Sequence, residues 1–586
     1  MEITGFTITK GKKYECGGIY VLNSAFTISH NRIQGNEGAL GGGIYAEVGE
    51  SVPFAITQNT ISDNTGHFGI GLHLIGGRGT ITDNTISDCD GGVLVMEGEH
   101  TISQNTIQNN RSSGMVLSHG KHLVTQNIIT GNTSLHDGGG LFLEHGTHII
   151  ADNTISKNKA HKGCGMYLQY GDHIITGNRI TENVGIEGLI SGGGGGLGIW
   201  EGSHLIQGNV ISKNETYRGD GGGLWLHGGS NTLLDNEITD NTCRGTYYRF
   251  EDGGVAIVGG RGGGVYAQEG NHILRDNTIS GNNAYNELES ISSGGGIYGF
   301  RCELVVEDNA IDLNSAYFGG GVAIESTGSL VVSGNKVTNN ESVDLGGGLY
   351  LSAQLLEVTN NTVTGNKTST SGGGIFVSVN ELILTDNLVE NNTAGIYGGG
   401  ISVGADEYIV ADNVILGNTA SSGGGVFLQG LGNFTDNEVR GNHATGKPAP
   451  FEQKLPPTTG GGGMYLYYGE CTLANNLFSD NTTSGHGGGL HVLSGEHIFS
   501  GNEVYSNKSE KDGGGIYLSH NEHPALLYNR VVFKDNLFEL NDAKLNGGAI
   551  WVHASSDAVN HQGAPLLEPD LANGYTSNSP EDIYRQ

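Results

Sequence analysis

The sequence is poor in basic residues and contains no long apolar run. Lysine and arginine together number 29 among 586 residues, against 61 aspartates and glutamates, so the formal net charge is −32. A protein that binds nucleic acid needs a basic surface, and this charge therefore argues against nucleic acid as a partner. It argues equally against an anionic polysaccharide, unless cations such as Ca²⁺ bridge the two. No stretch approaches roughly 18 consecutive apolar residues, so no transmembrane segment is expected.

Cysteine is also scarce, and its spacing predicts no covalent or metal framework. The chain contains no CxxC pair and no spacing typical of a zinc site. Six cysteines are too few for a disulfide framework in a chain of this length. We therefore expect free, partly buried thiols at Cys16, Cys89, Cys164, Cys243, Cys302 and Cys471.

What the sequence has in abundance is repetition. Residues 137–158 read DGGGLFLEHGTHIIADNTISKN, and nearly the same pattern recurs to the end of the chain. Four consecutive spacings between Asn309 and Asn413 are each 26 residues, and longer spacings mark insertions. Nineteen copies begin at the first asparagine of an Asn-x-aliphatic element, at Asn31, Asn59, Asn84, Asn105, Asn127, Asn153, Asn178, Asn209, Asn236, Asn277, Asn309, Asn335, Asn361, Asn387, Asn413, Asn437, Asn476, Asn502 and Asn536.

The parity of the apolar residues predicts short strands. An apolar residue lies three positions before each of these asparagines, and another lies two positions after it, as Ile150 and Ile155 do around Asn153. This period of two indicates strands. The triplet after each glycine run, such as residues 141–143, indicates a third strand. Its outer two side chains are expected to point inward and its middle one outward.

Short strands that recur at one spacing predict an all-β parallel β-helix, in which stacked coils bury a shared core. We expect about twenty coils of three short strands in a single domain over residues 1–586. Residues 1–16 would form an incomplete first coil and about 556–586 a C-terminal cap or tail. The repeated asparagines are expected to form a ladder of hydrogen bonds from coil to coil.

The repeated pattern GGGIY…ITDNTISDN resembles the right-handed parallel β-helix repeat of the pectin-lyase-like superfamily. The recurring Gly-Gly-x-Ile/Leu and Asn pairs are also similar to repeats of chlamydial polymorphic outer-membrane proteins. The resemblance covers residues 3 to about 560 and implies a right-handed coil. It leaves the activity open, because this fold hosts lyases, hydrolases, epimerases, adhesins and stalks.

Histidines recur in five consecutive copies, which raises the question of a metal site. Each lies five residues before the first asparagine, at the inward parity. In later copies the equivalent residues are leucines, among them Leu330 and Leu356. We therefore expect a partly buried ladder of neutral rings and no metal site. The five histidines are His100, His122, His148, His173 and His204.

The outward position of the post-glycine strand is aromatic in thirteen of twenty copies. Two interpretations stay open. Exposed rings, one per coil, would form a surface for stacking against sugars. Alternatively, the rings stack on one another because aromatic residues favour strands.

Insertions point to a candidate site. They occupy residues 184–195, 242–262, 283–293 and 443–460, with a fifth near 521–530, and the first three neighbour one another across coils. Insertions in a solenoid often mark its binding face, and this region is rich in the groups that a saccharide site uses. The candidate catalytic residues are Arg218, Arg249, Glu201, Asp220, Glu251 and Asp252. The candidate ligand-binding residues are Trp200, Trp225, His227, Tyr247, Tyr248, Tyr266 and Tyr298.

Three functions fit these features. The leading hypothesis is an extracellular or cell-surface β-helix that binds polysaccharide or another cell surface, as an adhesin or stalk does. The second is a polysaccharide lyase with Arg218 or Arg249 as base and Ca²⁺ on a uronate, or a glycoside hydrolase with two carboxylates. The third is a structural rod of a larger surface protein. We expect a secreted or cell-surface protein, a monomer or a segment of a larger chain. No cofactor is expected, except Ca²⁺ if the ligand is a uronate polymer.

The start of the chain already fits the repeat. The first twenty residues show no signal-peptide pattern, and Gly5-Phe6-Thr7-Ile8 occupies the Asn-Thr-Ile position with Phe6 in place of asparagine. The chain is therefore expected to begin inside a coil, either after removal of a leader and cap or as a fragment.

Overall fold

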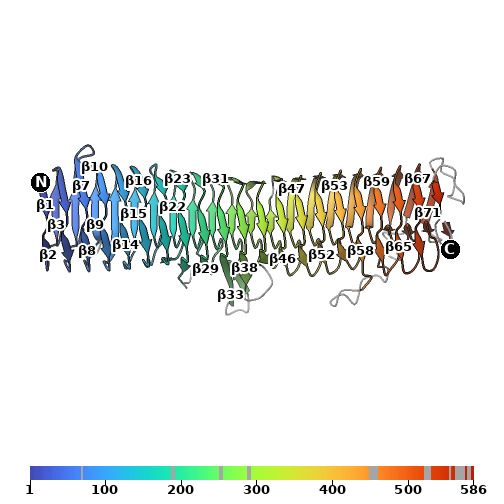
Figure 1. The fold of residues 1–586 in the computed structure, drawn as a ribbon, viewed down its shortest axis with the longest axis horizontal. Helices are drawn as coiled ribbons and strands as arrows, with labels where there is room; N and C mark the ends of the chain where they lie inside the picture. The colour runs from blue at the N-terminus through green and yellow to red at the C-terminus, as the bar shows by residue number, and fades with distance from the viewer. Residues whose placement is uncertain are drawn as a thin grey trace. The chain divides into compact units, whose positions relative to one another are not determined.

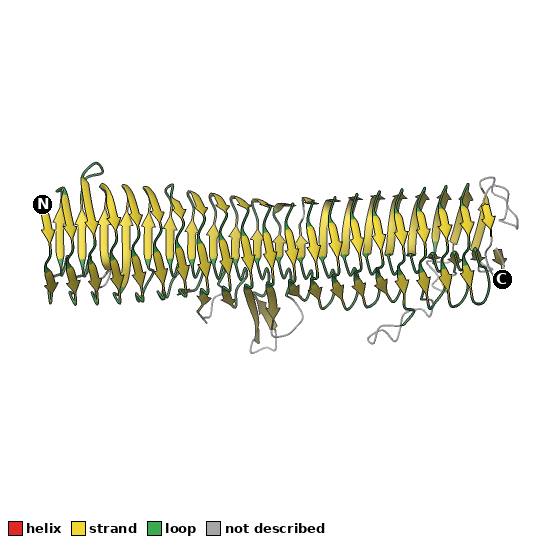
Figure 2. Ribbon diagram, viewed as in Figure 1, coloured by secondary structure: helices red, strands yellow, loops and turns green. Residues whose placement is uncertain are grey.

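The computed structural model describes residues 1–66, 70–186, 192–249, 255–286, 292–326, 328–447, 459–519, 529–552, 556–560, 574–576 and 583–585. All regular secondary structure in these residues is β-strand (Figure 1, Figure 2). No helix in this part of the chain is long and apolar enough to cross a membrane. The chain divides into two compact units, which are described separately: unit 1, Met1–Glu303, and unit 2, Leu304–Gln586.

Each coil of unit 1 contributes up to four strands. In one coil they are β18 (Leu141–Glu144), β19 (Ile149–Ala151), β20 (Thr154–Ser156) and β21 (Lys159–Ala160). Their equivalents in the next coil are β22 (Met166–Gln169), β23 (Asp172–Thr176), β24 (Arg179–Thr181) and β25 (Val184–Gly185), and all four pairs run parallel. We call these the first, second, third and fourth strands of a coil. The first three confirm the predicted parallel coil, and the fourth, only two residues long here, was not predicted.

The inward and outward positions follow the predicted parity. Leu141 and Leu143 are fully buried, as are Ile150 and Ile155 on the second and third strands. Because every coil repeats this pattern, aliphatic side chains stack into a continuous core within each unit. Burying one such side chain stabilises the fold by roughly 1.5–3 kcal/mol. The number of coils and the single domain stay predictions.

The asparagine ladder is confirmed. The Oδ1 atom of Asn153 accepts hydrogen bonds from the backbone N and the Nδ2 atom of Asn127, both at 2.9 Å. Its own Nδ2 atom donates to the carbonyl oxygens of Ala151 and Val124. A second ladder lies five residues after the first, for example at Asn158. Each side chain therefore connects neighbouring coils at the two corners of the third strand.

One position breaks the second ladder. Cys89 occupies it, and the Nδ2 atom of Asn64 lies 3.9 Å from its sulfur, whereas the preceding rung, from Asn36 to Asn64, is 3.0 Å long. The backbone N of Cys89 still donates to Asn110 at 3.1 Å. The thiol is fully buried, and burial raises its pKa to about 11, so it offers only a weak acceptor.

Replacing Cys89 with asparagine should restore the missing rung. We expect C89N to stabilise unit 1 by about 1 kcal/mol, the net contribution of a buried hydrogen bond. Thermal unfolding would show a higher midpoint for the variant. A lower midpoint would mean that the cysteine position is too small for an amide.

A short turn joins the first and second strands in unit 1. Glu97 and Gly98 both have positive φ, 63° and 79°. Two such residues in succession bend the chain sharply between the two strands, and glycine adopts the second position without strain. The Nε2 atom of His100 lies 3.2 Å from the carbonyl oxygen of Glu97 and so ties the turn to the second strand. The same contact recurs at His204 and His272.

The predicted histidine ladder is also confirmed. The rings of His100, His122, His148, His173 and His204 stack with centroids 4.8–5.0 Å apart, and all five are at most 4% exposed. The backbone N of His148 donates to the Nδ1 atom of His173. The rings therefore act as neutral connectors between coils.

In unit 2 several coils lack this turn. The first and second strands merge into single strands of 10 or 11 residues, which are β47 (Leu349–Thr359), β50 (Ile375–Thr385), β53 (Ile401–Ala411), β56 (Val426–Thr435) and β59 (Met464–Ala474). The sequence Ala353-Gln354 replaces the x-Gly pair, and the backbone stays extended through the corner. Leu356 and Leu382 fill the histidine position and are buried. The asparagine ladder continues, with Asn361 bonded to Asn387.

The segment expected to form a C-terminal cap or tail contributes further strands. These are β71 (Ser556–Asn560), β72 (Gly574–Thr576) and β73 (Ile583–Arg585). They pair in parallel with β67 (Asn529–Lys534), β68 (Leu537–Glu539) and β70 (Ile550–Val552). The described part of this segment therefore extends the stack of coils.

Candidate functional site

Most of the aromatic row on the first strands of unit 1 is buried. Tyr266 and Tyr298 are 2% exposed and Trp225 is 9% exposed. They lie on β30 (Leu224–His227), β35 (Val265–Gln268) and β39 (Ile297–Phe300), and they point outward as predicted. Of the two interpretations that the sequence left open, the stacking of rings on one another is observed, as between Tyr266 and Tyr298. The exposed stripe is wrong for most of the row, including Tyr45, Tyr167, Trp225, Tyr266, Tyr298, Tyr465, Tyr517 and Trp551.

In several coils the residue just before the glycine run packs on these rings. Arg261 places its guanidinium 5.5 Å from the ring centroid of Tyr266 and 5.8 Å from that of Tyr298. In unit 2, Tyr397 lies 4.7 Å from Phe427 in the same way. These distances are typical of cation–π and aromatic contacts. We call these residues the covering residues; sequence analysis missed them because their type changes from coil to coil.

Asp220, a predicted catalytic carboxylate, holds Arg261 in place. Its two carboxylate oxygens accept hydrogen bonds from the Nε and Nη2 atoms of Arg261 at 3.1 and 3.0 Å. The backbone N of Arg261 donates to the same carboxylate at 3.2 Å. Burial raises the pKa of Asp220, and Arg261 opposes that rise. The geometry thus gives Asp220 a structural role over Tyr266.

Trp225 is covered by backbone and by a lysine. An added Cβ at Gly193 would lie 2.7–2.9 Å from the indole ring, so the glycine rests directly on the ring face. The Nζ atom of Lys162 lies 5.8 Å from the ring centroid of Trp225 and 5.7 Å from that of Trp200. Trp225 and Tyr266 therefore do not form the floor of an open groove.

The structure does not bring the predicted carboxylates Glu201 and Asp220 together. Asp220 precedes β30, whereas Glu201 follows β26 (Leu197–Trp200), and the two strands pair in register. The two carboxylates therefore lie at opposite ends of neighbouring four-residue strands, and four strand residues span about 13 Å. The carboxyl pair of a glycoside hydrolase lies only about 5 to 9.5 Å apart. Arg218 lies at the turn after β29 (Glu215–Tyr217), with φ 53°, on the same side as Asp220.

The insertion at 242–262 forms a hairpin in its described part. The strand β33 (Thr242–Arg249) pairs antiparallel with β34 (Val255–Val258) and continues the column of fourth strands. Arg244 forms an ion pair with Glu215 and lies 5.4 Å from the ring of Tyr217. Backbone of the candidate residues Tyr247, Tyr248 and Arg249 belongs to β33, but their side chains lie outside the described residues, as do Glu251 and Asp252 entirely. Their predicted roles stay predictions.

Accessible rings occur instead at the edge where the first strands end. His119 and His145 have ring centroids 5.0 Å apart, and His145 stacks on Tyr170 at 5.0 Å. In the next two coils Trp200 stacks on His227 at 4.1 Å. The backbone N of Tyr170 donates to the carbonyl of Trp200 at 2.9 Å, which joins the two groups. Consecutive coils thus each contribute one ring, and we call this set the turn-edge ring row: His119, His145, Tyr170, Trp200 and His227.

The row differs from the buried one in its exposure. Tyr170 is 39% exposed and His119 is exposed, while His145, Trp200 and His227 are half-buried. Polar groups flank it. The hydroxyl of Ser118 donates to Glu144 at 3.1 Å, and Lys162 lies over the indole of Trp200. The rings stack on one another along the row, so the row presents ring edges together with charged and hydroxyl groups, which can contact a saccharide.

No group of three or more metal-ligating side chains converges among the described residues. The six cysteines are buried and free, in agreement with the sequence. Burial raises the pKa of each thiol, to about 12 for Cys164 and Cys471. Thiol chemistry therefore contributes nothing to this surface.

A family model agrees with the fold. A family model described as a right-handed β-helix region matches residues 2–155, 70–260, 253–413 and 395–562. Among solved structures, a periplasmic alginate epimerase is similar at 10% identity and TM-score 0.18, over 84% of this chain and 77% of that chain. A mutant alginate lyase of family PL6 is similar at 11% identity and TM-score 0.21, over 100% and 97%. No curated protein matches.

Proposed function

Because the chain belongs to the right-handed β-helix family, whose coils align equivalent side chains along one face, we propose that it binds a polysaccharide along the turn-edge ring row of unit 1. The protein would act outside the cell or at its surface, as a binding module or stalk. The observation that carries this proposal is the presence of one accessible ring in each of five consecutive coils.

The spacing of these rings suits a polymer. Coils in a parallel β-helix repeat at about 4.8 Å, which is close to the advance of an extended polysaccharide per sugar unit. Tyrosine and tryptophan present an apolar face together with a polar edge, and sugar rings do the same. A chain lying along the row could therefore contact the outer edges of Tyr170, Trp200 and His227 in succession.

The charge of the protein restricts the ligand class. At a net charge of −32 the molecule repels polyanions. We therefore propose a neutral polysaccharide, or an acidic one only when Ca²⁺ bridges its carboxylates to those of the protein. Lys162 lies beside Trp200 and supplies one positive charge that a polar substituent of the polysaccharide could contact.

Binding rather than hydrolysis is the function that the geometry favours. Glu201 lies beside the turn-edge ring row, after the end of β26. Asp220 lies at the opposite end of the first strands, before β30, and is hydrogen-bonded to Arg261. A lyase with Arg218 or Arg249 as base, and a purely structural rod, remain sequence-based alternatives. An assay for depolymerisation of the bound polysaccharide, with and without Ca²⁺, distinguishes the enzyme from the binding module.

Truncation of an accessible ring should weaken binding. We expect W200A to lose about 1–3 kcal/mol of binding free energy, by analogy with stacking of bases on aromatic side chains. Affinity electrophoresis through gels that each contain one polysaccharide measures the effect directly.

The matched control is W225F, since Trp225 is buried one coil further along. This variant should migrate as the wild type does in every gel. The proposal fails if no polysaccharide in the panel retards the wild-type protein, or if W200A is retarded as strongly as the wild type.

A further inference from the structure

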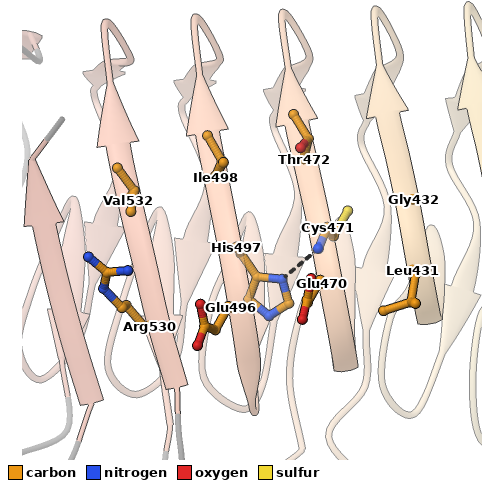
Figure 3. Close-up of a pocket in the computed structure, with 10 residues that line it drawn as sticks. All are labelled: Leu431, Gly432, Glu470, Cys471, Thr472, Glu496, His497, Ile498, Arg530 and Val532. Atoms are coloured by element: carbon orange, nitrogen blue, oxygen red, sulfur yellow. Dashed lines mark hydrogen bonds between the residues drawn. The ribbon is translucent and has the colours of Figure 1, made fainter.

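Unit 2 contains a surface trough that the proposed function does not use. It follows the second-strand positions of the merged strands and continues over β63 (Gly495–Ser500) and β67. One hollow of about 370 Å³ reaches from Leu355 to Asn433, and another of about 380 Å³ reaches from Leu431 to Val532 (Figure 3). The two share Leu431 and Gly432, so they form one continuous depression.

Two parallel rows of outward side chains line the trough. The first is mainly acidic, and register pairing places its members side by side from strand to strand: Glu381, Glu407, Leu431, Glu470, Glu496 and Arg530. The second lies about 7 Å along each strand, two residues further, and is mainly aliphatic: Ile383, Ile409, Asn433, Thr472, Ile498 and Val532.

A local irregularity deepens the trough at its centre. The strand β56 is one residue shorter than its neighbours, and the register shifts on both of its sides. Gly430 has φ 124°, a conformation that side-chain-bearing residues rarely adopt. Gly432 carries no side chain above Tyr408. Tyr408 and Cys471 therefore border the hollow although they are only 3% exposed.

Aliphatic side chains in the lining are exposed, and its carboxylates form no ion pair. Ile409 is 46% exposed, Leu431 47% and Ile498 50%. Within the described part of the chain, Glu381, Glu407, Glu470 and Glu496 form no ion pair, and all four are exposed. Such a surface leaves aliphatic area in water and concentrates negative charge beside it.

We propose that this trough docks an amphipathic α-helix of a partner protein, with an apolar stripe on the aliphatic row and lysines or arginines on the acidic row. Charge complementarity selects a basic partner, since four carboxylates face one arginine. The aliphatic row selects the apolar stripe, in the manner of helix-in-groove recognition. Long basic side chains also cover aliphatic surface with their methylene groups.

Length and pitch fit a helix. Seven strands, from β47 to β67, line the trough, and at about 4.8 Å per coil they span about 29 Å. A helix of about 19 residues has this length, and its 5.4 Å pitch is close to the coil spacing. In an extended peptide, side chains on one face repeat every two residues, at roughly 6.8 Å, which differs more from the coil spacing of about 4.8 Å. The negative C-terminal end of the helix would lie toward Arg530.

Other occupants fit less well. The trough offers no exposed aromatic ring among its lining residues, so sugars would find no stacking surface. A second copy of this chain is acidic and would be repelled. The adjacent carboxylates lack a third converging ligand in the described residues, so a metal ion alone is not favoured.

The test uses the full chain and a labelled synthetic peptide of about 18 residues, composed of leucine and lysine in amphipathic order. Fluorescence anisotropy should show binding that weakens with salt. A peptide with glutamate in place of lysine should not bind. The double variant E407Q/E496Q should bind the lysine peptide about five- to tenfold more weakly, and I409T/I498T should also bind more weakly.

The matched control removes two carboxylates from third strands, with E390Q/E503Q in β51 (Leu388–Glu390) and β64 (Glu503–Tyr505). It should bind as the wild type does. Equal losses in both double variants would show general attraction to an acidic protein and overturn the proposal. So would absence of binding, displacement of the peptide by neutral oligosaccharides, or self-association of the wild type that E407Q/E496Q abolishes.

Discussion

Acidification from pH 7 to pH 5 should open the histidine-containing coils of unit 1 before the leucine-containing coils of unit 2. Burial lowers the pKa of His148 to about 2 and that of His122 and His173 to about 3. Neighbouring rings lower these values further through charge repulsion. Burial also lowers the pKa of His100 to about 4, against small opposing effects of the Glu97 carbonyl and the Glu99 carboxylate.

The sign follows from proton binding in the two states. An unfolded histidine has a pKa of about 6.5, so below that pH the unfolded chain takes up protons that the folded ladder excludes. Stability is therefore complete above about pH 6.5 and falls as the pH drops toward the folded pKa values of about 2 to 4. At pH 5 the loss is about 2 kcal/mol per buried histidine. Five adjacent histidines make this one of the largest effects expected for the molecule.

Hydrogen exchange at pH 7 and pH 5, corrected for intrinsic rates, measures the effect coil by coil. Amides from residues 97 to 204 should lose protection, while those from 330 to 384 should keep it. The variant H148L, which introduces the residue found in the leucine coils, should fold at pH 7 and reduce the acid loss. The account is contradicted if both regions lose protection together, or if H148L unfolds at neutral pH.

Removal of one rung of the asparagine ladder in unit 2 should destabilise it by about 3–5 kcal/mol. The Oδ1 atom of Asn361 accepts from the backbone N and Nδ2 of Asn335. Its Nδ2 atom donates to Val332, Thr359 and Asn387. N361A leaves several buried groups without a partner, and each costs about 1 kcal/mol or more. Denaturant unfolding measures the loss.

N380A provides the control, since Asn380 is exposed and bonds only to the exposed Asp406 in the described contacts. It should change stability by less than about 0.5 kcal/mol. Because solenoid coils couple mainly to their neighbours, lost protection in N361A should centre on the adjacent coils. A variant as stable as N380A would show that the ladder contributes little.

Parity was sufficient to predict the coil, because side chains alternate strictly on a strand. Ile150 and Ile155 are buried because they lie at inward positions of their strands, as the parity of the sequence predicted. The fourth strand escaped prediction because two residues, such as Lys159–Ala160, are too short to show a period. The sequence predicted that the histidine rings form a ladder between coils, but not that rings such as that of His100 also contact the turn before them. The recurring x-Gly-x-His pattern, as in Glu97–His100, is the signal that the ring fastens a turn.

The burial of the aromatic row could not be read from the same pattern. Parity shows that Tyr266 points outward, but it does not show what lies above it. Arg261, Tyr397 and His486 occupy one covering position with different chemistry, so no periodic signal marks them. The accessible rings lie two or three residues beyond the predicted row. Trp200 and His227 were predicted as binding residues, and Tyr170 was not.

The most direct test of the proposed function is to locate a bound polysaccharide on the protein. Hydroxyl-radical footprinting of unit 1, with a polysaccharide that retards the protein in gels, reports the exposure of individual rings. The account predicts that oxidation of Tyr170 and Trp200 falls on binding, while oxidation of the buried Trp225 and Tyr266 stays low throughout. Protection elsewhere, with Tyr170 and Trp200 oxidised as in the free protein, would contradict it.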